Sequence, residues 1–339
     1  MTDADKHHST RPEHPFATYI RILGKGKSGT RSLSVAEATE AFDMVLRREV
    51  EPLQVGAFLM LLRVKEETGE ELAGFVNACR DRMIPPPPRL AADLDWSSYA
   101  GKRHQHPWFI LSVLLLAQAG HRVFMHGSDG HTEGRLYTEA AFHQLGLPVA
   151  RDWDQAAAML AGPSLCYLPL RHFCHTLHEL MQLKPLLGLR SPVNTLARML
   201  NPLRAPCSIQ SIFHPAYGAL HQRADQLLGQ PRALVFKGDS GEVEIRPQAD
   251  TRLLLLCEGR QEEILLPRSL EERVASVAAP HTGPLLELWR GTAENAYGLA
   301  AVTATAAAAL LLLDGDLEPA GARRRATTLW QSRDRSRLG

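Results

Sequence analysis

The chain has 339 residues, of which 45% are apolar and 22% are charged, and its formal net charge is +1. This length exceeds the size at which one hydrophobic core usually divides, so we expect two domains. The composition excludes wholesale disorder. The nearly neutral balance means that attraction to a polyanion needs local clusters of Lys and Arg.

Cysteine usage and apolar runs bear on the compartment. The five cysteines are odd in number and form no C-x-x-C pair, which suits a reducing cytoplasm. The polar N-terminus lacks the apolar segment of a signal peptide. The longest apolar run, Leu299 to Leu313, is shorter than the roughly 20 residues that cross a bilayer. We therefore expect a buried helix in a cytoplasmic protein without membrane contact.

The first third of the chain carries the periodicity and the caps of consecutive helices. Ser34 with Glu37, and Thr68 with Glu71, match the S/T-x-x-E capping box, in which each side chain accepts the other residue's backbone N–H. Four prolines at 85–88 then hold the backbone extended and end the helical block.

Beyond the prolines, short apolar runs alternate with helical stretches, which predicts an α/β fold with a mostly parallel sheet flanked by helices. We place a small helical domain at residues 1–84, the α/β domain at 85–320 and a mobile basic tail at 321–339. A helical stretch at 171–200 interrupts the strands, and we expect it to pack with the helical domain. The predicted strands are 122–126, 164–169, 208–213, 232–237 and 252–257.

Three stretches carry a family resemblance. The sequence LSVAEATEAFDMVLRREVEPLQVGAFLMLLRVKEET, from Leu33, resembles the helical domain of anthranilate phosphoribosyltransferases, which belong to glycosyl transferase family 3. RVFMHGS at 122–128 resembles that family's strand and K-H-G-N loop. LKPLLGLRSPVNTLARMLNP at 183–202 resembles its R-x-x-L-G-x-R-T-x-x-N-x-x-x-P-L-x-N-P segment. The resemblance implies a phosphoribosyltransferase or nucleoside-phosphorylase-II-like fold, and a homodimer formed through the helical domain.

The pyrophosphate loop of that family is altered in this chain. The family's G-T-G-G-D loop cradles the pyrophosphate of phosphoribosyl pyrophosphate on backbone amides. Only one glycine remains, and a cation replaces the carboxylate. The residues that match the loop here are Ser98, Tyr99, Ala100, Gly101 and Lys102.

The metal and acceptor positions of the family are altered too. The Asp-Glu pair that holds magnesium falls on Val243 and Glu244, and Val243 offers no oxygen ligand. Asp239 and Glu242 are weak replacement candidates. Lys184 stands at the acceptor-binding arginine and lacks the planar guanidinium suited to a carboxylate. Anthranilate is therefore a poor expectation for the substrate, and we assign no residue as catalytic.

The segment DWSSYAGKRHQHPW at 95–108 instead resembles the YbiB-type branch of the family, in which a dimer with a basic groove binds nucleic acid without sequence preference. A basic loop at 21–31 has three glycines and no acid, which suits phosphate, although a solvated helix connector would look the same. Residues 102–106 precede Pro107, where a helix N-terminus would attract phosphate; an ordinary strand-to-helix loop is the alternative. Further cations are expected in the cleft at the carboxyl ends of the strands. The predicted phosphate-binding residues are Arg21, Lys25, Lys27, Arg31, Lys102, Arg103, His104, His106, His126, Arg171 and Lys184.

Other patterns are less specific. The histidines and cysteine at 171–178 suggest zinc, but no second ligand pair stands at a standard spacing, so we expect no metal there. Tyr99 and Trp108 are candidates for stacking on bases, although Trp108 suits a core position better. The arginines at 323–325 add phosphate contacts or belong to a solvated end.

The sequence therefore predicts sequence-independent binding of DNA or RNA by a homodimer with a degenerate catalytic site and no required cofactor. The alternative is an active phosphoribosyltransferase that uses Mg²⁺ and phosphoribosyl pyrophosphate on an unidentified acceptor. Asp239, Glu242 and Glu244 would then organise the metal. A third possibility is a regulatory protein that binds a phosphorylated metabolite in the inherited cleft.

Overall fold

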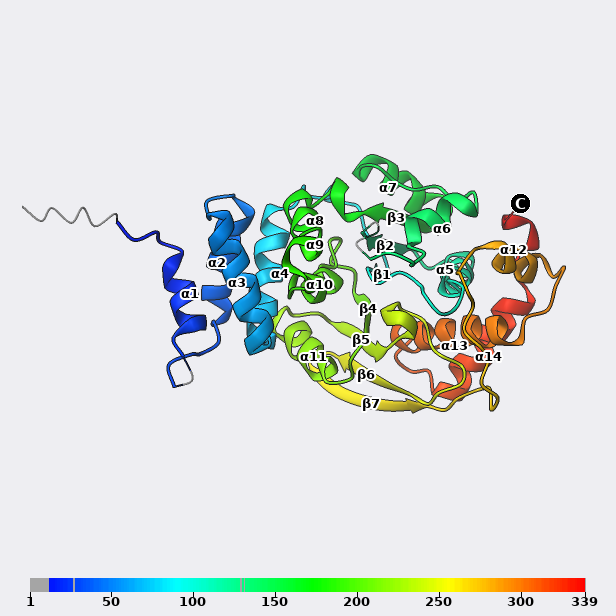
Figure 1. Ribbon diagram of the computed structural model, residues 1–339. Coiled ribbons are helices and arrows are strands. Elements are labelled where there is room, and N and C mark those ends of the chain that lie inside the picture. Colours follow the sequence, from blue (N-terminus) through cyan, green and yellow to red (C-terminus); the bar gives the residue numbers. More distant parts are fainter. Residues whose placement is uncertain (1–11, 27, 129, 131, 339) are drawn as a thin grey trace, which may run out of the picture.

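The computed structural model describes residues 12–26, 28–128, 130 and 132–338. A helical domain stands at one end and an α/β domain at the other (Figure 1). Both predicted capping boxes form, at Ser34 with Glu37 and at Thr68 with Glu71, because each side chain accepts the backbone N–H of the other residue. The first four helices are α1 (Ala17–Gly24), α2 (Val35–Leu46), α3 (Pro52–Lys65) and α4 (Gly69–Arg82).

The α/β domain contains one seven-stranded sheet in the order β3-β2-β1-β4-β5-β6-β7. The first five strands in this order are parallel, and β6 and β7 are antiparallel, which confirms the mostly parallel sheet. All five predicted strands are present, and β1 and β7 are additional. The strands are β1 (Leu94–Ser98), β2 (Val123–Gly127), β3 (Leu165–Pro169), β4 (Cys207–Ile212), β5 (Arg232–Lys237), β6 (Thr251–Cys257) and β7 (Arg260–Leu266).

Both faces of the sheet are covered, because successive side chains of a buried strand point to opposite sides. Leu165 and Tyr167 of β3 join the hydrophobic cluster of α5 and α13, whereas Cys166 and Leu168 join that of the helical domain. The second cluster also contains residues of α8 and α10, so the segment after β3 packs beside α4. The helices of this domain include α5 (Phe109–Gln118), α6 (Thr138–Gln144), α7 (Trp153–Ala161), α8 (His175–Met181), α9 (Lys184–Leu187), α10 (Val193–Leu196), α11 (Tyr217–Leu227) and α12 (Gly283–Arg290).

The C-terminal part of the chain is helical and packed. Helix α13 (Ala296–Leu313) is long and apolar enough to cross a membrane, but 72% of it is buried inside the molecule, as expected for a core helix. The expectation of a mobile basic tail is wrong. Residues 319–331 form α14 (Pro319–Gln331), which buries Ala322, Ala326 and Trp330, and the guanidinium of Arg333 stacks on the Trp330 ring.

Candidate functional site

The loop after β1 is closed by a carboxylate of the protein itself. Glu242, which follows β5 in the chain, is almost completely buried. Its Oε1 accepts the backbone N–H groups of Ala100 at 2.7 Å and Gly101 at 2.6 Å, and its Oε2 accepts the Ser98 hydroxyl at 2.7 Å. The amides that a pyrophosphate would need are therefore bonded to Glu242. We call this arrangement the closed cradle.

Lys102 belongs to the same cradle and is fully buried. Its ammonium donates to the carboxylates of Asp239 and Glu244, and the other oxygen of Glu244 accepts the Phe109 N–H at 2.9 Å. Burial alone lowers the pKa of Lys102, but the charges of Glu244 and Asp239 outweigh it and the pKa is raised. Burial raises the pKa of Glu244 to about 7, against the opposing effect of Lys102. Lys102 is thus engaged internally and does not present its charge to a ligand.

The next residues of the predicted phosphate loop diverge sharply in exposure. Arg103 and His104 are exposed, whereas His106 is buried and its Nδ1 accepts the backbone N–H of His281 at 3.1 Å. Burial also lowers the pKa of His106, which disfavours the charged form. Arg103 and His104 remain accessible to a phosphate, and His106 does not.

The basic loop near α1 is partly neutralised. Arg21 pairs with Glu13, and Arg31 pairs with Glu37 at 2.6 Å. Lys25 is exposed, and Lys27 lies outside the described residues. Two of the four predicted cations in this loop therefore already have carboxylate partners.

The residues predicted at the ends of β1 and β2 are core residues. His126 is fully buried, its Nδ1 shares a hydrogen bond of 2.6 Å with the Tyr99 hydroxyl, and its Nε2 lies 3.2 Å from Asp95 Oδ1. Tyr99 and Trp108 are each 1% exposed. These side chains hold the strand ends together and are not placed to touch a base or a phosphate without rearrangement.

The cleft between the helical domain and the sheet gathers four cations that we call the cleft cations: Arg103, Arg135, Lys184 and Arg190. Arg135 donates to the carbonyls of Ala100, Gly101 and Ser240, and Lys184 donates to the Thr132 hydroxyl at 2.9 Å. Among the described residues, none of the four forms an ion pair with a carboxylate.

The cleft cations are close enough to repel one another. Burial lowers the pKa of Arg135, and the charges of Arg190 and Arg103 lower it further, against the opposing effects of Tyr137 and Glu242. The pKa of Lys184 is lowered by burial and then by Arg190 and Arg135. Mutual repulsion of this kind is relieved by a bound anion.

Arg171 lies at the edge of this region in a different state. Its guanidinium pairs with Glu139 at 2.6 Å, and both side chains line a cavity with Arg135. The suggested metal cluster at 171–178 is not supported, since no group of three or more metal-ligating side chains occurs in the part of the chain that the structure describes.

The chain is similar to known proteins over most of its length. Residues 17–83 match the helical bundle domain of the glycosyl transferase family. YbiB of Escherichia coli is 30% identical over 247 residues, which cover 71% of this chain and 76% of that protein. An anthranilate phosphoribosyltransferase of Methylobacterium radiotolerans is 31% identical over 241 residues, which cover 69% of this chain and 67% of that enzyme. The chain belongs to the anthranilate phosphoribosyltransferase family.

The solved structures agree with this membership at the level of the fold. The anthranilate phosphoribosyltransferase of Saccharomyces cerevisiae in complex with phosphoribosyl pyrophosphate and magnesium superposes with a TM-score of 0.78. The match covers 95% of each chain at 16% sequence identity. The protein is therefore phosphoribosyltransferase-like in architecture.

The family's magnesium does not fit the residues of the closed cradle. Lys102 occupies the carboxylates of Asp239 and Glu244, and Glu242 is bonded to the backbone amides and Ser98. Val243, at the family's aspartate, has no ligand atom and is buried. A divalent cation needs oxygen ligands that are free to coordinate it, and this arrangement offers an ammonium in its place.

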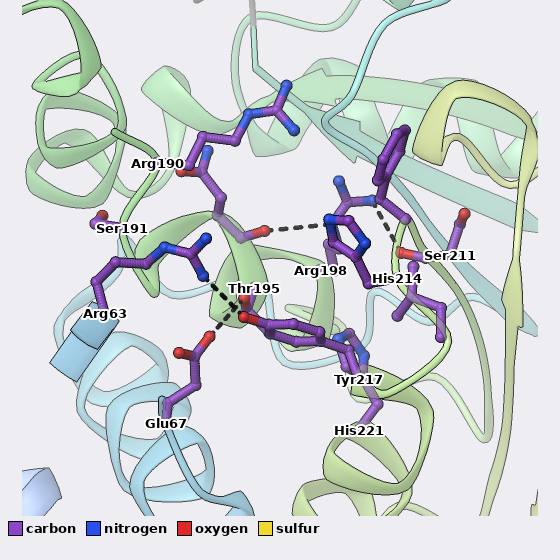
Figure 2. Close-up of a pocket in the computed structure, with 13 residues that line it drawn as sticks. Arg63, Glu67, Arg190, Ser191, Thr195, Arg198, Ser211, His214, Tyr217 and His221 are labelled. Atoms are coloured by element: carbon purple, nitrogen blue, oxygen red, sulfur yellow. Dashed lines mark hydrogen bonds between the residues drawn. The ribbon is translucent and has the colours of Figure 1, made fainter. Parts of the chain in front are cut away.

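Sequence reasoning missed a second basic feature, a pocket on the helical-domain side of the cleft (Figure 2). It gathers Arg63, Arg190 and Arg198 from three separate segments, and Figure 2 shows Arg63 and Arg190 opposite Arg198. One signal in the sequence could have found it. Arg198 stands where the family segment R-x-x-L-G-x-R-T-x-x-N-x-x-x-P has its proline.

Proposed function

We propose that this protein binds nucleic acid through its phosphates, without sequence preference, in the cleft between its two domains. One observation carries the proposal: Arg103, Arg135, Lys184 and Arg190 converge there and, within the described residues, have no carboxylate partner. Cations held together against their mutual repulsion favour a ligand with several negative charges, and a nucleic acid backbone supplies a row of them.

The closed cradle supports a changed role for the inherited site. In the described arrangement Glu242 and Lys102 take the places that pyrophosphate and a metal ion would need. The remaining positive charge lies outside the closed cradle, on Arg103 and the other cleft cations. Arg103 is exposed, and Arg135, Lys184 and Arg190 are partly buried, so we infer that this charge meets a long ligand rather than enclosing a small one.

The direct test is a polarisation titration of labelled single-stranded and double-stranded DNA and RNA over a salt series. We expect binding of all four, with log Kobs falling linearly with log salt. The double variant R103A/R190A should weaken binding to every sequence equally. The matched control is R89A/R260A, which removes the same charge from exposed positions outside the cleft. Equal behaviour of the two double variants would refute the placement of the interface.

We also propose that the protein is a homodimer through its helical domain. Leu53 and Val64 of α3 are 88% and 82% exposed, and Leu186 of α9 is 81% exposed. The two helices are neighbours, since a Cβ at Gly56 of α3 would stand 3.9 Å from Leu187 of α9. An exposed apolar face of this kind is typical of a subunit interface. Sedimentation equilibrium should show a dimer for the wild type and a monomer for L53D/L186D, and a monomeric wild type would overturn the proposal.

The second candidate function is phosphoribosyl transfer to an unidentified acceptor. The names of the relatives favour it, since several are anthranilate phosphoribosyltransferases and one solved neighbour holds phosphoribosyl pyrophosphate and magnesium. It requires Lys102 to leave the two carboxylates. Magnesium-dependent release of pyrophosphate, measured with a panel of aromatic and nucleobase acceptors, would establish it, and absence of release with intact nucleic acid binding would favour the first proposal.

A further inference from the structure

The pocket beside the cleft is built for a ligand of mixed character. We call it the arginine pocket and define it by Arg63, Glu67, Arg190, Arg198, Phe213 and Tyr217 (Figure 2). Its cavity volume is about 140 Å³. Pockets that enclose a drug-sized ligand are larger, at roughly 300–1,000 Å³, so this one takes a small group whose remainder stays outside.

Arg198 gives the pocket a buried positive charge. The side chain is 8% exposed, and it is held by backbone carbonyls: Nη1 donates to Ser211 at 3.0 Å and Gly241 at 2.8 Å, and Nε donates to Asn194 at 3.2 Å. Burial lowers the pKa of Arg198, against the opposing charge of Glu242, and the charge of Arg190 adds to the lowering. A guanidinium held in place by neutral groups, with a second guanidinium nearby, suits a phosphate group.

Glu67 supplies an independent sign of a ligand. It is 6% exposed, and its Oε1 accepts the Thr195 hydroxyl at 2.9 Å. Its Oε2 is buried and has no hydrogen-bond partner among the described residues. A buried oxygen of this type is costly unless a donor reaches it. The pocket therefore offers an unfilled acceptor position, which a hydroxyl or amino group would satisfy.

Phe213 and Tyr217 are the aromatic side chains that line the pocket, and we call them the stacking wall. Phe213 is 49% exposed, and the Tyr217 hydroxyl is fixed by Arg63 Nη1, which donates to it at 3.0 Å. Partly exposed aromatic rings beside a cationic group provide a stacking surface for a planar base. Phosphate, hydroxyl and base are together the parts of a nucleotide.

We propose that the arginine pocket binds one nucleoside monophosphate, either free or at the phosphorylated end of a strand. The phosphate contacts Arg190 and Arg198, a hydroxyl or amino group donates to Glu67, and the base lies against Phe213 and Tyr217. This site is separate from the sequence-independent interface at the cleft cations, although the two share Arg190. Binding of a monophosphate in the arginine pocket does not depend on binding of a nucleic acid polymer at the cleft cations.

The experiment is isothermal titration calorimetry with nucleoside 5′-monophosphates, using the matching nucleosides, ribose 5-phosphate and inorganic phosphate as comparison ligands. We expect the monophosphates to bind tightest. R198M and R190M should each weaken them at least about tenfold, as expected for loss of a charge-assisted hydrogen bond. R260M, at an exposed position outside both the pocket and the cleft, is the matched control and should bind as the wild type does. Because Arg190 is only partly buried, R190M keeps the test valid if R198M does not fold.

Several results would overturn the inference. Nucleosides that bind as tightly as their monophosphates would exclude the phosphate contact, and inorganic phosphate that binds as tightly would exclude the base contact. A Tyr217→Ala variant should weaken monophosphates and leave inorganic phosphate unchanged, and an equal effect on both contradicts the stacking wall.

Competition identifies the source of the nucleotide. Monophosphates that displace a 5′-phosphorylated oligonucleotide, but not its 5′-hydroxyl counterpart, indicate a strand end, and displacement of neither supports a free nucleotide. Failure of the polymer interface would instead appear as loss of salt-dependent binding of both oligonucleotides, with the calorimetry unchanged.

Discussion

The closed cradle and the arginine pocket lie on the same cleft and treat positive charge in opposite ways. In the cradle, Lys102 meets Asp239 and Glu244, and Glu242 is saturated by amides and a hydroxyl. In the pocket, the hydrogen bonds of Arg198 go to carbonyls, and the charges that act on it are those of Glu242, which belongs to the cradle, and of Arg190. The first region is complete without a ligand, and the second is not.

This difference shows how a catalytic site can lose its ligand while the surrounding fold persists. A buried cation requires a compensating anion, which either the protein or a ligand supplies. Where the chain supplies carboxylates, the need for a pyrophosphate or a metal disappears. Where its hydrogen bonds to the cation come from carbonyls, as at Arg198, an external anion can still bind the cation.

The largest expected effect is on folding, from K102A. Removal of the ammonium leaves Asp239 and Glu244 buried without a compensating cation, which should reduce the free energy of unfolding by about 3–5 kcal/mol. K184A, which removes a cation without a carboxylate partner, should change it by less than about 0.5 kcal/mol. Urea unfolding of both variants measures the two changes in free energy of unfolding. Similar changes would contradict the distinction between Lys102, which has carboxylate partners, and Lys184, which has none among the described residues.

The second effect comes from emptying the cradle with E242A. Loss of this carboxylate leaves the Ala100 and Gly101 amides unpaired, which should cost about 1–3 kcal/mol. Inorganic pyrophosphate should then raise the melting temperature of E242A and leave that of the wild type unchanged, since only the variant has free amides for it. E242Q, which retains an acceptor oxygen, is the control. A wild type stabilised as strongly as E242A would show that the cradle is open in solution.

The third effect concerns the salt dependence of nucleic acid binding. R190A should reduce the slope of log Kobs against log salt by about 0.9, the value for one lost phosphate contact on duplex DNA. R21A should leave the slope unchanged, because Arg21 already pairs with Glu13. A lower slope for R21A would place the interface at the loop near α1 instead.

The smallest expected effect is on stability, from the exposed ion pair between Arg31 and Glu37. The guanidinium of Arg31 holds the pKa of Glu37 near 2, below its ordinary value of 4.5. The pair therefore stabilises the protein above pH 4.5, and this contribution is lost as the pH falls towards 2. E37Q keeps the capping box and removes the charge, so it should cost at most about 1 kcal/mol at pH 7. In urea unfolding, the difference in free energy of unfolding between E37Q and the wild type should shrink below pH 4.5. A difference that does not change with pH would assign the effect to the capping box instead of the ion pair.

Local sequence patterns predicted most of the fold. The helix caps at Ser34 and Thr68 and the five apolar strands depend on neighbouring residues, so they are visible in the sequence. Strand β1 was missed because it carries Asp95 and Ser97 in its buried interior, where Asp95 accepts a hydrogen bond from Ser208. Strand β7 was missed because its residues are mostly polar and exposed at the sheet edge.

The candidate site was less predictable, because charge in a sequence does not reveal its partners. Lys102 and Arg103 are adjacent and looked equivalent, yet the first is fully buried and the second is exposed. The partners of Lys102 lie 137 and 142 residues away, so only the fold could assign them. The same holds for the arginine pocket, whose three arginines come from α3, the loop after α9 and the segment after α10.

Two glycines beside the cradle, Gly127 and Gly238, are required by the fold itself. A side chain at Gly127 would overlap the carbonyl of Ser98, and one at Gly238 would overlap the carbonyl of Glu242. Both positions are therefore fixed by a close approach of the backbone, between paired strand ends for Gly127 and within one loop for Gly238, whether or not a ligand binds. Purifying selection for folding alone would preserve them among descendants of this chain. Glycines retained at these two positions are consequently no sign that phosphoribosyl pyrophosphate chemistry has been retained, and the substitutions at positions 98, 100 and 102 of the cradle are the more informative trace of its loss.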